Sequence, residues 1–197
     1  MSSDPIHEDL RARLVTDCGR CFALCCVATT FQASPEFAAD KDAHTACPEL
    51  GADHRCTIHG DLVDRGYAGC VVYDCRGAGV VVSQQTFAGR DWRTHPDEAT
   101  AMFEAFLVVR VLHEQLELLL RARELPLPAD VVADIDALIT TVSTASLLPS
   151  SSLHHGLADR LRAETTAMLR RLAPHLSSLS SSRAVRSSLV QISKRTT

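Results

Sequence analysis

Eight cysteines lie close together in the N-terminal part of this 197-residue chain. All of them fall between residues 18 and 75, at Cys18, Cys21, Cys25, Cys26, Cys47, Cys56, Cys70 and Cys75. A buried thiolate is costly unless it is paired or coordinated, and thiolates are common ligands of zinc and of iron-sulfur clusters. The concentration of thiols therefore predicts one or two metal centres, with all eight cysteines as candidate ligands.

Two other uses of cysteine have to be weighed against metal binding. An even number of cysteines in a secreted chain would favour a disulfide framework. The N-terminal sequence MSSDPIHEDL has no positively charged segment followed by an apolar one, so it predicts no secretory signal and favours a reducing cytoplasm. Single cysteines also pack as small apolar residues in protein cores, but eight in one region favour ligation.

The spacing of the first four cysteines bears on the choice of metal. They occur in DCGRCFALCC, residues 17–26, and a helix there would place Cys18, Cys21 and Cys25 on one face, with Cys26 pointing partly away. Neighbouring cysteines do not easily bind one tetrahedral ion, but they can bind different iron atoms or separate centres. This spacing favours an iron-sulfur cluster whose fourth ligand is Cys26 or a later cysteine. Two four-thiolate zinc sites, which would also use eight cysteines, are the alternative.

Fewer residues outside the cysteines suggest chemistry. Gly77 and Gly79 in CRGAG could let backbone amides approach a cluster sulfur or an anionic ligand, with a simple turn as the alternative. His59, three residues after Cys56, could add an imidazole ligand or serve only in hydrogen bonding. Because no nucleophile with a partner base stands out, the sequence leaves open whether the protein is an enzyme.

The order of these elements resembles a known family. CGRCFALCC, then CPEL, then RCTIHGDLVDRGYAGCVVYDC is similar to the YkgJ-type zinc- or iron-chelating cysteine-rich domain, in which Tyr usually stands at the position of His59. Residues 15–93, with YDCRGAGVVVSQQTFAGRDWR, more closely resemble the cysteine-rich N-terminal region of some actinobacterial proteins described as carrying pentapeptide repeats, which are absent here. The resemblance implies metal binding through these cysteines and leaves the reaction open.

The sequence after Arg93 is typical of helices. Apolar residues recur at helical spacing from Met102 to Leu120, and Pro96 is expected near the start of this helix. Two more amphipathic segments follow at about 130–143 and 153–172, joined by short linkers that favour antiparallel neighbours.

We therefore predict a mainly α protein in which a loop-rich cysteine module with little sheet packs on an antiparallel helical bundle and shares its core. The expected domains are a cysteine-rich metal-binding module (1–93), the helical bundle (94–176), and a Ser-rich linker with a basic C-terminal segment (177–197). The best strand candidate is GVVVSQQTF, residues 79–87.

Composition and charge limit the partners. A formal net charge of -4 argues against general nucleic-acid binding, which needs a dominant basic field. No apolar run reaches the roughly 18 residues of a membrane-spanning helix, so we expect a cytoplasmic protein away from membranes. Two functions remain. One is an iron-sulfur protein with redox or catalytic use on a small-molecule substrate or a protein partner. The other is a zinc-stabilised module that binds a protein partner without catalysis.

Overall fold

The computed structural model describes residues 5–175, so the predicted linker and basic segment at 177–197 lie outside the described residues. The described chain is mainly helical, with a long loop-rich region between α2 (Leu24–Ala28) and α3 (Ala68–Val72). Its β contacts are three isolated bridges, Phe31 with Lys41, Ser34 with Phe37, and Leu50 with Cys56. Within the described residues, the prediction of a mainly α fold with little sheet is confirmed.

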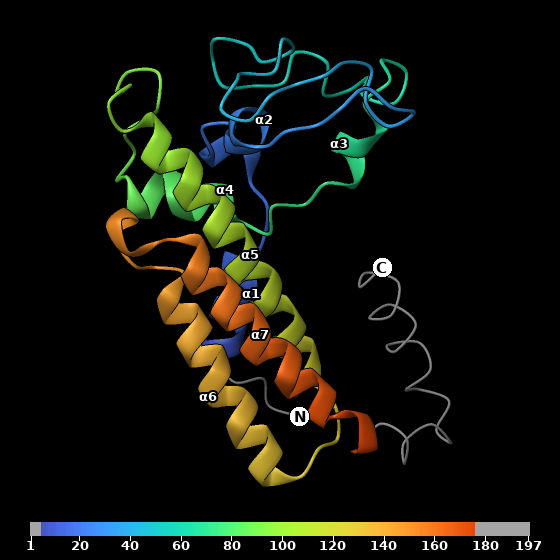
Figure 1. The fold of residues 1–197 in the computed structure, drawn as a ribbon, viewed down its shortest axis with the longest axis vertical. Helices are drawn as coiled ribbons and strands as arrows, with labels where there is room; N and C mark the ends of the chain where they lie inside the picture. Colours follow the sequence, from blue (N-terminus) through green and yellow to red (C-terminus); the bar gives the residue numbers. More distant parts are fainter. Residues whose placement is uncertain (1–4, 176–197) are drawn as a thin grey trace.

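Three long helices form the body of the molecule, α5 (Ala99–Arg123), α6 (Ala129–Ala145) and α7 (His155–Arg171). Figure 1 shows them side by side beneath the loop-rich region, with α1 (Pro5–Arg13) against them. The predicted bundle is confirmed, although α5 begins at Ala99, about one turn after the expected start at Pro96. None of the helices described is long and apolar enough to cross a bilayer.

Residues 17–26 do not form the single helix that their spacing predicted. A 3₁₀ turn, η1 (Cys18–Arg20), is capped by Asp17, whose side chain accepts a hydrogen bond from the backbone N–H of Gly19 at 2.8 Å. The chain is then extended at Cys21, and Ala23 is left-handed with φ 55° before α2 begins. The first three cysteines therefore do not share a helical face, and the expectation that they do was wrong.

The predicted strand at 79–87 is also wrong, because this segment is helical. It consists of α4 (Ala78–Val80) followed by a π-helix, η2 (Val81–Thr86). Val81 and Val82 are buried in the main core, so the β-branched run packs its apolar side chains from a helix instead of a sheet. Burial against neighbouring elements overrides the local strand preference of this run.

The apolar core of the described chain has two parts of very different size. The main core runs from α1 to α7 and includes Leu24, Val27, Cys75 and Ala78 from the cysteine-rich region. The second core consists of buried Ile58, Leu62 and Tyr67, with Phe31, Phe37 and Cys56 packed partly buried against it. One end of the cysteine-rich region is thus anchored on the bundle. The outer loops, residues 29–67 between α2 and α3, have few apolar contacts of their own.

Candidate functional site

All eight cysteines line one cavity of about 660 Å³. Most of its wall comes from the loop-rich region and its flanking turns, and Phe106 of α5 contributes from the bundle. Aromatic residues occupy much of the rest of the wall, namely Phe31, Phe37, Tyr67 and Tyr73. Cysteines from four separate stretches of sequence therefore face a common space with an apolar lining.

The sulfur atoms are spread around this cavity wall. All eight cysteines are free thiols, and the sulfur atoms of Cys25 and Cys26 are 3.9 Å apart. Ligand sulfurs of a tetrahedral zinc site lie at about this separation, given Zn–S bonds of about 2.3 Å. Among residues 5–175, however, no three His, Cys, Asp or Glu side chains are grouped closely enough to hold a metal ion. The donor set fits thiolate-binding metals, but several side chains would have to move inward to bind one ion.

The loop that carries Cys18 and Cys21 is held by hydrogen bonds to its backbone carbonyls. The guanidinium of Arg55 donates to the carbonyls of the first two residues of η1, the second of these bonds being 2.8 Å long. The side-chain amide of Gln84, in η2, donates to the carbonyl of the third at 2.8 Å. Side chains far away in sequence therefore shape this loop.

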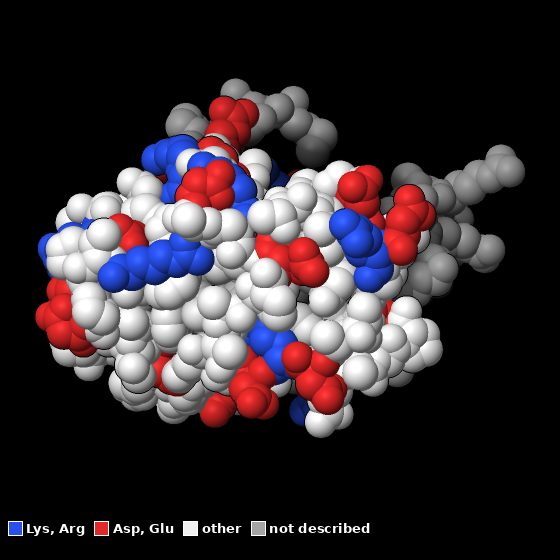
Figure 2. All heavy atoms as spheres, turned by 90° about the horizontal axis from the view of Figure 1, so that it is seen from above, with Lys and Arg blue, Asp and Glu red and all other residues white. Residues whose placement is uncertain are grey.

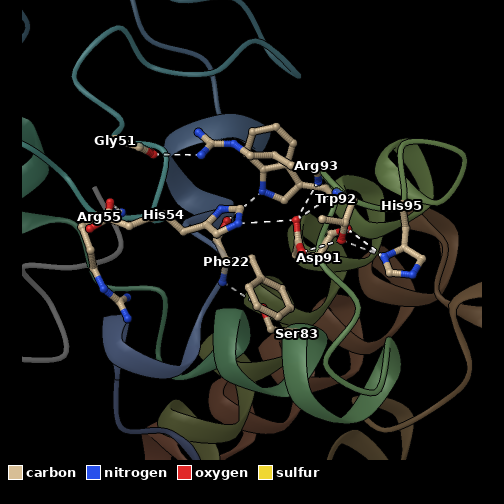
Figure 3. Close-up of polar contacts among 11 residues, drawn as sticks. Phe22, Gly51, His54, Arg55, Ser83, Asp91, Trp92, Arg93 and His95 are labelled. Carbon is tan, nitrogen blue, oxygen red and sulfur yellow. Dashed lines mark hydrogen bonds and ion pairs between the residues drawn. The ribbon is translucent and has the colours of Figure 1, made fainter.

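Phe22, the residue after Cys21, is fixed through both of its backbone groups (Figure 3). The indole N–H of Trp92 donates to its carbonyl at 2.8 Å, and its own N–H donates to the hydroxyl of Ser83 at 3.1 Å. Its ring also packs against the ring of His54, with centroids 5.5 Å apart. The π-helix and the segment before α5 thus position the residue that joins the first two cysteines to α2.

His54 lies in the cavity wall, and its Nε2 is 3.4 Å from Oδ1 of Asp91 (Figure 3). Burial, and then the positive charge of Arg93, lower the pKa of His54, which favours a neutral ring near pH 7. Its Nδ1 is buried and has no hydrogen-bond partner among the described residues. The sequence left open whether His54 orients a thiolate or is a solvated loop residue, and the structure places this ring nitrogen away from solvent. His59 also lines the cavity, but its side chain is exposed.

Lys41 is a buried cation that the sequence gave no reason to single out. Its side chain is only 3% exposed, and its ammonium donates to the carbonyls of Val27 at 3.2 Å, Thr29, and Asp42 at 3.0 Å. A hydrogen bond with the neighbouring thiol, and then the charge of Lys41, lower the pKa of Cys26. Lys41 thus holds a fixed positive charge near the thiols.

The two glycines predicted to bind a cofactor make close packing contacts. Gly77 has φ 69°, and a Cβ there would lie 2.1 Å from the carbonyl oxygen of Arg13 at the end of α1. A Cβ at Gly79 would lie 2.5 Å from the sulfur of Cys21. Neither glycine belongs to the described residues that line the cavity. Because glycine has no side chain, another group can pack closely at both positions, and at Gly79 that group is the thiol of Cys21.

Burial keeps most of the cavity thiols protonated in the metal-free protein. It is the main factor that raises the pKa of Cys21 and of Cys70, each to about 11. The pKa of Cys25 is raised well above the ordinary value, first by its hydrogen bond with Cys26 and then by burial. Because a metal binds the thiolate, each metal-sulfur bond formed near pH 7 must release a proton.

The metal-free protein is expected to lose stability as the pH rises from about 9 to about 11. In this range the Cys21 thiol ionises when the chain unfolds but stays protonated in the folded state, so the unfolded state binds fewer protons and is favoured. The full shift, from 9.0 to about 11, corresponds to about 3 kcal/mol for Cys21, of which about 2 kcal/mol is lost by pH 10.5. Urea denaturation at pH 8 and pH 10.5 measures it, with Cys21→Ala as the control, which should lose less stability over the same range. An equal loss in both proteins would contradict this role of Cys21.

Comparison with known proteins gives one relative. The chain is 36% identical over 164 residues to YybG of Bacillus subtilis (strain 168), which is described as an uncharacterised protein. The match covers 83% of this chain but 59% of YybG, so the chain spans less than two thirds of that relative. No family model and no solved structure matches the chain. The similarity extends beyond the cysteine-rich region, since 83% of the chain exceeds the share that residues 1–93 make up.

Proposed function

We propose that the protein holds an iron-sulfur centre in the cysteine-lined cavity and uses it for redox or catalytic chemistry. The observation that carries this proposal is the convergence of all eight thiols on one space of about 660 Å³. A single zinc ion takes four ligands at about 2.3 Å and needs far less room. An iron-sulfur cluster contains several iron and sulfide atoms and takes thiolates that stand further apart.

Residues of the chain have separate parts in this proposal. The cysteines supply thiolate ligands, and a cluster so bound accepts and donates single electrons. Phe31, Phe37 and Tyr67 limit the access of water to the cavity. The buried ammonium of Lys41 offsets part of the negative charge that thiolates bring into an apolar space. Arg55 keeps the first cysteine loop in place through its hydrogen bonds to two of the loop's carbonyls.

A zinc-stabilised interaction module is the second candidate, and the outer loops favour it. Their small core leaves a structural need that a metal could meet. Val71 and Val72 in α3 are 56% and 84% exposed, and Val63 is 65% exposed, which suits contact with an apolar surface of a protein partner. Figure 2 shows charged side chains of both signs interspersed with broad uncharged areas on the face seen from above.

Purification of the full chain without oxygen tests the two candidates against each other. We expect a brown protein that contains iron and acid-labile sulfide, because such clusters absorb visible light and zinc does not. Cys21→Ser should weaken the colour, whereas Val63→Ser, a change at an exposed site in the same region, should keep it. Colourless protein with stoichiometric zinc and no sulfide would overturn the iron-sulfur proposal in favour of the zinc module.

A further inference from the structure

The cavity cysteines pack against two different cores. Cys75 belongs to the main core, and Cys21 and Cys25 are partly buried against it. A Cβ at Gly79 would lie 2.5 Å from the sulfur of Cys21 and 3.9 Å from that of Cys75, so these two sulfurs flank the same point of the backbone. Cys56, by contrast, packs on the second core. The thiols are therefore divided between the bundle side and the outer loops.

Backbone contacts connect Cys26, Cys47 and Cys70 to the structure around Cys56. The N–H of Cys47 donates to the carbonyl of Cys26 at 2.9 Å, which ties the CPEL loop to α2. Leu50 in that loop forms a β-bridge with Cys56. The N–H of Cys70 donates at 3.0 Å to the carbonyl of Tyr67, a residue of the second core against which Cys56 packs. The four cysteines at 26, 47, 56 and 70 are thus held in one connected piece of structure.

Contacts around the first cysteine place it with the thiols on the bundle side. The hydroxyl of Thr16 lies 3.5 Å from the sulfur of Cys75. The carbonyl of Arg20, at the end of the 3₁₀ turn that Cys18 begins, accepts a hydrogen bond from the side-chain amide of Gln84 in η2 at 2.8 Å. Cys18 therefore lies in a turn that is tied to Cys75 and to the π-helix on the bundle side.

The two groups meet at the adjacent residues Cys25 and Cys26, whose sulfurs are 3.9 Å apart. Successive side chains on a helix such as α2 point about 100° apart, so these two thiols can serve different centres. We infer that the cavity holds two neighbouring metal centres. The first quartet of ligands is Cys18, Cys21, Cys25 and Cys75, and the second quartet is Cys26, Cys47, Cys56 and Cys70. The inference rests on the proposed metal binding, and four thiolates suit either metal.

The ligand sets are tested by metal content in single and double variants of the full chain. Iron, zinc and acid-labile sulfide are measured per chain after purification without oxygen. Cys21→Ala and Cys47→Ala should each lose about half of the metal. The double variant within one quartet, at Cys21 and Cys75, should still keep half, whereas the double variant across quartets, at Cys21 and Cys47, should lose nearly all. Complete loss in every single variant that keeps its helical circular dichroism would overturn the division.

Native mass spectrometry of the unsubstituted protein gives a second test that needs no variant to fold. During gradual removal of metal by a chelator, we expect a species that has lost one centre and kept the other. Removal in one step, with only full and empty chains present, would overturn the inference of two centres. The proposed function fails separately, since it would be contradicted by unsubstituted protein that carries no metal at all.

Discussion

Removal of the metal that we propose is expected to unfold the outer loops and to leave the helical bundle folded. The loops between α2 and α3 have a buried apolar core of three residues and isolated β-bridges, so apart from hydrogen bonds such as those of Lys41 they have few stabilising contacts. Metal binding contributes about 10–16 kcal/mol to the folding of small zinc peptides, and an effect of this order would dominate here. Backbone hydrogen exchange before and after chelation measures it. Protection should fall across residues 31–67 and persist across 102–120.

Readdition of the metal without oxygen provides the control for this prediction. Protection of the loops should then return, because the ligands remain in the chain. The segment Cys18–Phe22 should be affected less than the outer loops. Apart from the hydrogen bonds donated by Arg55, the contacts that hold this segment come from η2 and Trp92, which lie on the bundle side. Metal-free protein whose outer loops stay as protected as before would contradict a structural role for the metal.

The substitution Phe106→Ala is expected to destabilise the protein by about 3–5 kcal/mol. Phe106 is completely buried in the main core and also lines the cysteine cavity. Its removal leaves a space beside the first half of α5 that neighbouring side chains cannot easily fill, and this space would join the cavity. Denaturation with guanidinium, monitored by the helical signal in far-ultraviolet circular dichroism, gives the free energy of unfolding.

Leu147→Ala is the matched control, because it also truncates a large apolar side chain. Unlike Phe106, Leu147 is 46% exposed, and it follows α6. We expect this change to cost less than about 1 kcal/mol. A similar loss of stability in the two variants, or a loss below about 1 kcal/mol for Phe106→Ala, would show that the region around Phe106 repacks readily.

The helical bundle was predictable because its residues obey one simple rule. Apolar side chains recur at helical spacing along α5, which predicts that they are buried on one side of a helix. The structure shows that they are buried. The left-handed Ala23 was not predictable, since an alanine gives no local signal for a conformation that costs energy. It persists because contacts on both sides, at Phe22 and in α2, fix the chain. The run Val80–Val82 was misjudged for a related reason, as its helical state depends on burial.

The candidate site was predictable in its thiols but not in their surroundings. Eight cysteines in one short region already indicated a common site, and all of them line one cavity. Lys41, Ser83 and Gln84 gave no such signal, because ordinary polar residues acquire their part only through hydrogen bonds with distant segments. Such bonds depend on the complete fold, which spacing along the chain does not reveal.

The π-helix Val81–Thr86 makes this part of the chain sensitive to its exact number of residues. A π-helix is wider than an α-helix and accommodates an extra residue without lengthening the path of the chain. Deletion of one residue would restore the narrower helix and turn the side chains within this segment around its axis. Ser83 and Gln84 would then face away from the loop that they hold. Insertions and deletions should therefore be tolerated far less here than substitutions at exposed positions.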